Sequence, residues 1–263
     1  MNPASLVPYR NLDNLRVVLV ATRNPLNIGA AARAMSNFGA EHLRVVNPYE
    51  VAFREARSAV GAAGLLAKAK EYATVAEAVA DCTLVVGTTA GGRRDLQHEL
   101  RRLESGARAI TRRTKTSPVA LLFGSEKFGL SNEDFSHCHW LMRIPTREAH
   151  GSMNLGQAVA LCLYELVREK AAAKNEKASR RNFTERELQA KAGDIERLTM
   201  LLYDVLRHSG YVKPQVAHAT EEKLRRMLRR LDLNAEDAEL WQGMLRQIQW
   251  KLDANKSHRE DEQ

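Results

Sequence analysis

Short apolar runs recur along the first two thirds of this 263-residue chain. They are LRVVLV at 15–20, HLRVV at 42–46, TLVVG at 83–87, VALLFG at 119–124 and WLMRIP at 140–145. Stretches whose apolar residues follow helical spacing lie between most of these runs. Continuous apolar runs of this length are typical of strands that are buried on both faces. The pattern therefore predicts an α/β fold, a mainly parallel sheet with helices on both faces.

The pattern changes near residue 170. Residues 171–182 are polar and charged and have no apolar stripe, which is typical of a linker or of a frayed helix end. Beyond them, apolar residues return at helical spacing and continue to Leu252. We therefore expect one domain over residues 1–170, a linker over 171–182 and a small all-α extension over 183–263.

The charge of the chain favours a polyanionic partner. Its formal net charge is +8 at pH 7, and residues 93–115 alone hold eight basic residues against three acidic ones. A basic surface gains free energy on a phosphate backbone by releasing counterions. We expect residues 93–115 to form a mobile basic arm that contacts the phosphates of a polyanionic partner; the alternative is a solvated, charged helix.

Cysteine usage and hydropathy limit the other classes of partner. The three cysteines are an odd number without CxxC spacing, which predicts a reducing compartment and hence the cytoplasm. The adjacent His137, Cys138 and His139 would point to opposite faces of an extended segment, so we expect no metal site. No stretch of about 18 apolar residues occurs, so we expect no membrane association.

Three polar loops each follow an apolar run. The first, NPLNIGAAARAM, contains Asn27 and Arg33, and the second, GSEKFGLSNED, contains Glu126. The third, TREAHGSMNLGQ, places Ser152 and Asn154 directly before a predicted helix. In open α/β sheets, ligands bind beyond the carboxyl ends of the strands. Together the loops predict a ligand site at that edge of the sheet.

Each loop taken alone also has a simpler explanation. Arg33 could be a solvent-facing arginine on a tightly packed alanine helix, and Asn154 could be only a helix N-cap. The second loop has glycines but lacks the GKS/T ending of a phosphate-binding loop. A dinucleotide-binding dehydrogenase would need GxGxxG after the first strand, and NIGAAA does not supply it.

The three loops in this order resemble the motifs of the SpoU/TrmH branch of the SPOUT methyltransferases. NIGAAARAMSNFG is similar to the first motif of that family, LLFGSEKFGLSNED to the second and IPTREAHGSMNLGQAVALCLYE to the third. The resemblance covers residues 15–170. VVGTTA before the basic segment, together with the helical extension, resembles the TrmJ-like tRNA methyltransferases within that branch.

The resemblance implies a fold and a cofactor. The C-terminal part of the sheet domain would be threaded into a trefoil knot, the protein would be a homodimer, and the cofactor would be S-adenosylmethionine. The expected cofactor-binding residues, matched motif by motif, are Thr88, Thr89, Gly124, Glu126, Gly129, Ile144, Pro145, Ser152, Met153, Leu155 and Ala158.

The implied reaction is methylation of a ribose 2′-hydroxyl in tRNA, at cytidine or uridine 32 of the anticodon loop. The expected catalytic residues are Arg33, Asn27, Glu126, Ser152 and Asn154. Because guanidinium stays protonated in proteins, we expect Arg33 to bind phosphate and stabilise the developing alkoxide, oriented by Glu126, and not to act as a base.

The expected RNA-binding residues are Arg23, Arg93, Arg94, Arg101, Arg102, Arg112, Arg113 and Lys115. The motifs report cofactor and chemistry, and they do not identify the RNA. A different tRNA position or a ribosomal RNA is therefore the main alternative. An RNA-binding protein that keeps the fold without catalysis is the alternative of another class.

Overall fold

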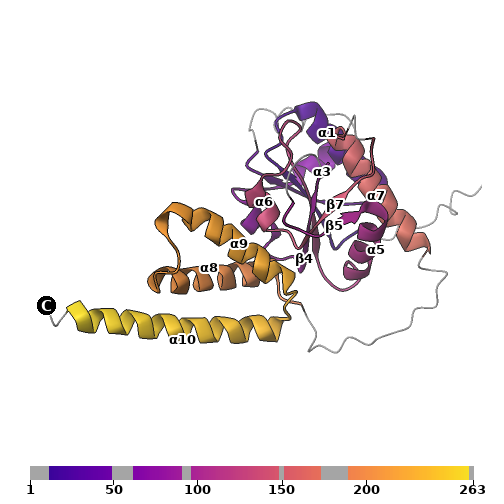
Figure 1. The fold of residues 1–263 in the computed structure, drawn as a ribbon. Helices are drawn as coiled ribbons and strands as arrows, with labels where there is room; N and C mark the ends of the chain where they lie inside the picture. The colour runs from indigo at the N-terminus through magenta and orange to yellow at the C-terminus, as the bar shows by residue number, and fades with distance from the viewer. Residues whose placement is uncertain (1–11, 49–61, 91–95, 148–150, 173–188, 261–263) are drawn as a thin grey trace, which may run out of the picture.

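In the part of the chain that the structure describes, seven strands form one parallel sheet (Figure 1). The computed structural model describes residues 12–48, 62–90, 96–147, 151–172 and 189–260. The strands are β1 Leu15–Val20, β2 His42–Val46, β3 Lys70–Tyr72, β4 Leu84–Thr88, β5 Leu100–Arg102, β6 Val119–Phe123 and β7 Trp140–Arg143. Their order across the sheet is β3-β2-β1-β6-β4-β7-β5.

Alternation along β1 divides the core between the two faces of the sheet. Val17 and Leu19 belong to one buried cluster, and Val18 and Val20 belong to another. All four side chains are 5 % exposed or less. Because successive side chains of a strand point to opposite faces, a strand buried on both faces is apolar throughout. The apolar runs of the sequence therefore belong to the central strands.

Helices cover both faces. α1 Pro25–Phe38, α3 Ala63–Ala67, α5 Leu103–Arg113 and α7 Leu155–Ala172 contribute to the first cluster, and α4 Val75–Val79 and α6 Asn132–Ser136 to the second. Asn24 fixes the start of α1, because its side chain accepts a hydrogen bond from the Leu26 N–H at 3.0 Å. Gly39 ends α1 in the left-handed region, with φ of 68°.

The C-terminal extension packs against the α/β domain. Its elements are α8 Ala192–His208, a 3₁₀ turn at Pro214–Val216, α9 Ala217–Arg230 and α10 Ala235–Glu260. The three helices share a third apolar core, and α8 lies between α9 and α10 (Figure 1). At the start of α8, the Ala192 N–H donates to the Cys82 carbonyl at 2.7 Å and the Gly193 N–H to the Ala80 carbonyl at 3.0 Å. The extension is thus joined to the sheet domain by backbone hydrogen bonds.

The predicted α/β class is confirmed, and each of the five predicted strands is present with its end shifted by three residues or fewer. Strands β3 and β5 were not predicted. The predicted mobile arm is wrong for residues 100–113, which form β5 and the ordered helix α5. Leu103, Ala107 and Ile110 of α5 are buried, so this helix is amphipathic and not solvated all round.

The predicted linker, 171–182, begins within α7, and its remainder lies outside the described residues. The domain division at this point stays a prediction, as does the trefoil knot.

Candidate active site

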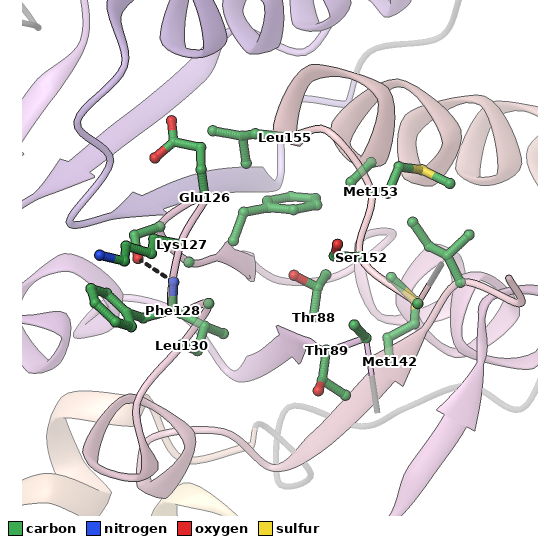
Figure 2. Close-up of a pocket in the computed structure, with 18 of the residues that line it drawn as sticks. Thr88, Thr89, Glu126, Lys127, Phe128, Leu130, Met142, Ser152, Met153 and Leu155 are labelled. Carbon is green, nitrogen blue, oxygen red and sulfur yellow. Dashed lines mark hydrogen bonds between the residues drawn. The ribbon is translucent and has the colours of Figure 1, made fainter. Parts of the chain in front are cut away.

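A cavity of about 350 Å³ lies at the carboxyl ends of β4, β6 and β7. Figure 2 shows the loop that carries Glu126, Lys127 and Phe128 on one side, and the segment with Ser152, Met153 and Leu155 on the other. Its lining residues are Thr88, Thr89, Ala90, Phe123, Gly124, Ser125, Glu126, Lys127, Phe128, Gly129, Leu130, Phe135, Met142, Ile144, Thr146, Gly151, Ser152, Met153, Leu155 and Ala158. The volume falls in the range typical of small-molecule and cofactor sites.

The loop after β6 closes tightly on itself. The Gly129 N–H donates to the Ser125 carbonyl at 2.8 Å, and the Phe128 N–H donates to Ser125 Oγ at 3.3 Å. Gly129 has a φ of 68°, which L side chains rarely adopt. A Cβ on Gly124 would lie 2.0 Å from the carbonyl carbon of Gly129. The two glycines therefore allow the turn that forms this wall of the cavity.

Three predicted catalytic residues form a hydrogen-bonded chain. Asn154 Nδ2 donates to Asn27 Oδ1 at 2.8 Å, and Asn27 Nδ2 donates to Glu126 Oε1 at 3.0 Å. Asn154 Oδ1 also accepts from the backbone N–H groups of Gly156 and Gln157, at 2.9 and 3.3 Å. Asn154 is therefore both the N-cap of α7 and a member of the chain, so its two interpretations hold together.

The close packing of α1 on α7 brings the hydrogen-bonded side chains together. A Cβ on Gly156 would lie 2.6 Å from the Ala30 Cβ, so a larger residue at position 156 would push the two helices apart. Asn27 lies in the first turn of α1, and Asn154 lies one residue before α7. The small residues of the first and third motifs therefore set the distance between two of the polar side chains.

The cavity contains ten of the eleven predicted cofactor-binding residues. Pro145 is the exception: it is exposed and absent from the lining, whereas its neighbour Ile144 is present. Successive residues of an extended segment point to opposite sides, which accounts for the exposure of Pro145 beside Ile144. Of the predicted catalytic residues, Ser152 and Glu126 line the cavity directly.

Arg33 does not line the cavity of its own chain. It is exposed on α1, six residues beyond Asn27. Helical geometry places it about 9 Å further along the axis and turned about 120° around it. Glu126 has described contacts with Asn27 and with the Arg23 N–H, the latter at 3.5 Å. Orientation of Arg33 by Glu126 stays a prediction.

Sequence reasoning missed several lining residues. Leu130 and Phe135 belong to the second apolar core and also line the cavity, whereas Phe128 is 68 % exposed. Lys127 Nζ lies 5.1 Å from the centroid of the Phe128 ring. Leu130 lies within the second motif and Phe135 directly follows it, in an apolar spacing that also fits an ordinary core. The sequence offered no signal that Phe128 would be exposed.

The predicted RNA-binding residues occupy different surroundings. Arg23, Arg102, Arg112 and Lys115 are exposed, and Arg93 and Arg94 lie outside the described residues. Arg101 forms an ion pair with Glu99 at 2.8 Å, and its guanidinium lies 4.5 Å from the Trp140 ring centroid. Arg113 lies 3.5 Å from Asp232 in the extension. Arg101 and Arg113 thus already have protein partners, and the exposed Arg102 also lies 3.6 Å from Glu104.

Across the residues that the structure describes, no group of three or more potential metal ligands was found. Cys82, Cys138 and Cys162 are buried and free, and burial raises the pKa of Cys82 and of Cys162 to about 12. Within the same residues, no helix has both the length and the apolar character needed to cross a bilayer.

Comparison with known proteins gives one consistent family. Residues 14–164 match the model of the SpoU rRNA Methylase family. The tRNA (cytidine/uridine-2′-O-)-methyltransferase TrmJ of Yersinia pestis (strain Pestoides F) is 35 % identical over 244 residues, which span 90 % of this chain and 92 % of that protein. The protein of the same name from Sodalis glossinidius (strain morsitans) is 33 % identical over 239 residues, 90 % of this chain and 92 % of that one.

The solved structures agree. The crystal structure of TrmJ from Z. mobilis ZM4 is similar with a TM-score of 0.75 and 30 % identity, over 89 % of this chain and 98 % of that chain. The similarity extends past the sheet domain into the helical extension. The family prediction is therefore confirmed: this chain belongs to the SpoU methylase family.

Proposed function

We propose that this protein is an S-adenosylmethionine-dependent methyltransferase that modifies the ribose 2′-hydroxyl of a cytidine or uridine in tRNA, at position 32 of the anticodon loop. The observation that carries the proposal is the Asn154–Asn27–Glu126 hydrogen-bonded chain, which joins side chains of all three family motifs and ends at Glu126, a lining residue of the cavity. Names of relatives support the substrate class, because the TrmJ proteins are tRNA (cytidine/uridine-2′-O-)-methyltransferases. The cytoplasm is the compartment that suits such a substrate.

The cavity has both the apolar surface and the polar groups that would suit S-adenosylmethionine. Leu130, Phe135 and Met142 offer apolar contact for a purine ring. The Thr88 hydroxyl donates to the Leu122 carbonyl at 2.8 Å, so towards a ligand it can only accept a hydrogen bond. Amino and hydroxyl groups of the cofactor supply such donors, and the exposed Glu126 carboxylate favours its positive charge. When bound there, the cofactor supplies an electrophilic methyl group.

Side chains of the protein itself hold the substrate hydroxyl. Asn27 and Asn154 orient the Glu126 carboxylate, because their amides donate in series toward Oε1. Glu126 Oε2 has a weaker contact with the Arg23 N–H, at 3.5 Å, and can accept a hydrogen bond from the ribose hydroxyl. Fixing a nucleophile in line with the reacting methyl group supplies much of the rate in a transfer of this kind.

Arg33 acts from a second copy of the chain. It is exposed and does not line the cavity of its own chain. Leu26 on α1 and Tyr164 on α7 are 80 % and 53 % exposed, which leaves apolar surface on the paired helices for a second copy. In the homodimer, Arg33 binds a substrate phosphate near the partner's cavity and stabilises the developing alkoxide.

Mixing two inactive variants tests this arrangement. Arg33→Ala and Glu126→Ala leave one intact member of the pair on each chain, so a heterodimer regains one complete site. Random exchange of equal amounts should restore about a quarter of the wild-type methyl transfer. A mixture that stays as inactive as either variant alone would show that both residues act within one chain.

The substrate assignment is tested with synthetic tRNA. A transcript with uridine at position 32 should accept the methyl group, and the same RNA with a single 2′-deoxy nucleotide at position 32 should not. A 2′-deoxy substitution at position 34 is the matched control and should leave transfer unchanged. Equal transfer to both substituted RNAs would place the modification elsewhere, and transfer to ribosomal RNA alone would favour the alternative substrate.

The exposed basic residues Arg23, Arg102, Arg112 and Lys115 bind RNA phosphates in this proposal. Arg101 and Arg113 contribute less, because their guanidinium groups are held by Glu99 and Asp232.

A further inference from the structure

The C-terminal extension contacts the sheet domain at α6, the short helix beside the cavity. Phe135 of α6 lines the cavity, and the next residue, Ser136, is fully buried beneath α9. The Ser136 hydroxyl donates to the Glu133 carbonyl at 2.6 Å and accepts from Arg225 Nη1 at 3.2 Å. One end of α6 therefore forms a wall of the cavity, while the same turn is held by a side chain of the extension.

Arg225 is built into this contact with its guanidinium pointing in a fixed direction. The residue is 5 % exposed. Its Nε lies 3.0 Å from both carboxylate oxygens of Glu196, and its Nη2 lies 2.9 Å from Glu196 Oε1. Glu221 on the same helix accepts a further hydrogen bond from Nη2. With these donors engaged inside the extension, Nη1 is directed at Ser136.

Glu196 links Arg225 to other residues where the extension meets the sheet domain. Its carboxylate lies 3.5 Å from Arg229 Nη2 and 3.6 Å from His137 Nδ1, the residue after Ser136. Arg229 Nη2 also donates to the Ala192 carbonyl at 3.1 Å. Buried ionic clusters of this kind cost desolvation energy and add little to stability. Their directional hydrogen bonds instead fix how two surfaces are oriented.

We propose that Arg225 is a positioning residue for the cofactor cavity: through Ser136 it holds α6, and with it Phe135, in the arrangement that binds the cofactor. The extension is then part of what determines cofactor affinity, besides any contact that it makes with RNA. The inference rests on the proposed binding of S-adenosylmethionine in this cavity.

Calorimetric binding of S-adenosylhomocysteine to the full chain tests the inference without any RNA. Arg225→Lys keeps the charge but removes the planar group that reaches Glu196 and Ser136 together. Ser136→Ala removes the acceptor on the sheet domain, together with the hydrogen bond that the same hydroxyl donates to the Glu133 carbonyl. Each should weaken binding about three- to tenfold, the range expected for one lost hydrogen bond. The double variant should be no weaker than the worse single variant, because both substitutions remove the same contact.

The matched control is Arg226→Lys, the same substitution one position along α9. Arg226 pairs with Glu222 of its own helix, so cofactor affinity should stay at the wild-type value. In steady-state assays the two test variants should raise KM for the cofactor and leave kcat nearly unchanged, whereas a purely structural role would lower thermal stability without this split.

Two results would overturn the inference, and they differ from each other. If the wild-type protein binds the ligand and both test variants bind it within twofold as well, Arg225 does not position the cavity. If the wild-type protein itself does not bind, the proposed cofactor is wrong and the inference falls with it.

Discussion

At the residue scale, local sequence pattern indicates only part of the polar set of the site, and the resemblance of the three motifs supplies the rest. Asn154 is recognisable as a helix cap, and the same side chain donates to Asn27. Pro145 shows the limit of matching motifs, since it is exposed and does not line the cavity, whereas its neighbour Ile144 does. The exposure of Phe128 depends on how the loop closes, and neighbouring residues in the sequence do not determine it.

Asn154→Asp separates the two roles of this side chain. The carboxylate can still accept from the Gly156 N–H, so helix capping and thermal stability should be retained. The donor to Asn27 is lost, and a second negative charge is placed near Glu126. Methyl transfer should therefore fall by at least about tenfold. Asn154→Ala should lose activity and also about 1 kcal/mol of stability. Near-normal turnover in Asn154→Asp would show that Asn154 is only a cap.

Gly124→Ala tests the closed loop. The new Cβ would lie 2.0 Å from the Gly129 carbonyl carbon, so the loop must open and cofactor binding should be lost. Gly64→Ala is the control, because nothing lies within 4 Å of its added Cβ in α3. That variant should bind normally and gain up to about 1 kcal/mol of stability. Thermal denaturation with and without S-adenosylhomocysteine measures both effects, and wild-type binding by Gly124→Ala would refute the steric argument.

At the element scale, the central strands were predictable and the edge strands were not. β6 is apolar throughout, and β1 is apolar except for Arg16, because both faces of these strands are covered. β3 reads KEY and β5 reads LRR, three residues each at the two edges of the sheet, where charged side chains are common. The arginines of residues 93–115 obscured α5, although Leu103, Ala107 and Ile110 follow helical spacing.

Arg112→Glu tests whether the exposed face of α5 binds RNA. If Arg112 neutralises a phosphate, its replacement should weaken tRNA binding and reduce the slope of log affinity against log salt concentration by about one. Lys68→Gln, a change at an exposed lysine beside α3, should leave the slope unchanged. Filter binding between about 50 and 200 mM salt measures this. An unchanged slope for Arg112→Glu would remove α5 from the RNA-binding surface.

At the scale of the whole molecule, the helical extension was predictable as a set of amphipathic helices, but its docking was not. Docking depends on polar side chains such as the buried Arg225 and the half-buried Glu196, which look like solvated charges in the sequence. The buried histidines are of the same kind. Burial lowers the pKa of His139 from 6.5 to about 3, assisted by the charges of Arg229 and Arg113.

Protonation of the unfolded chain should therefore make the protein sensitive to acid. Below about pH 6.5 the unfolded state binds a proton at His139 and the folded state does not, so stability falls as pH decreases toward 3. His139 Nδ1 accepts from the Val85 N–H at 3.1 Å, a contact that His139→Gln can keep. Between pH 7.5 and 5, the free energy of unfolding should fall less in this variant than in the wild-type protein. The difference should be up to about 1 kcal/mol per pH unit. Denaturant titrations at both pH values measure the difference, and an identical pH dependence in the variant would contradict the assignment.

The most direct test of the account is transfer of labelled methyl groups from S-adenosylmethionine to unmodified total tRNA, followed by nucleoside analysis and mapping of the label. The account predicts a 2′-O-methylated cytidine or uridine at position 32, with no label when Glu126→Ala replaces the wild-type protein. Label on a base, or no label in any RNA from a protein that binds the cofactor, would contradict it.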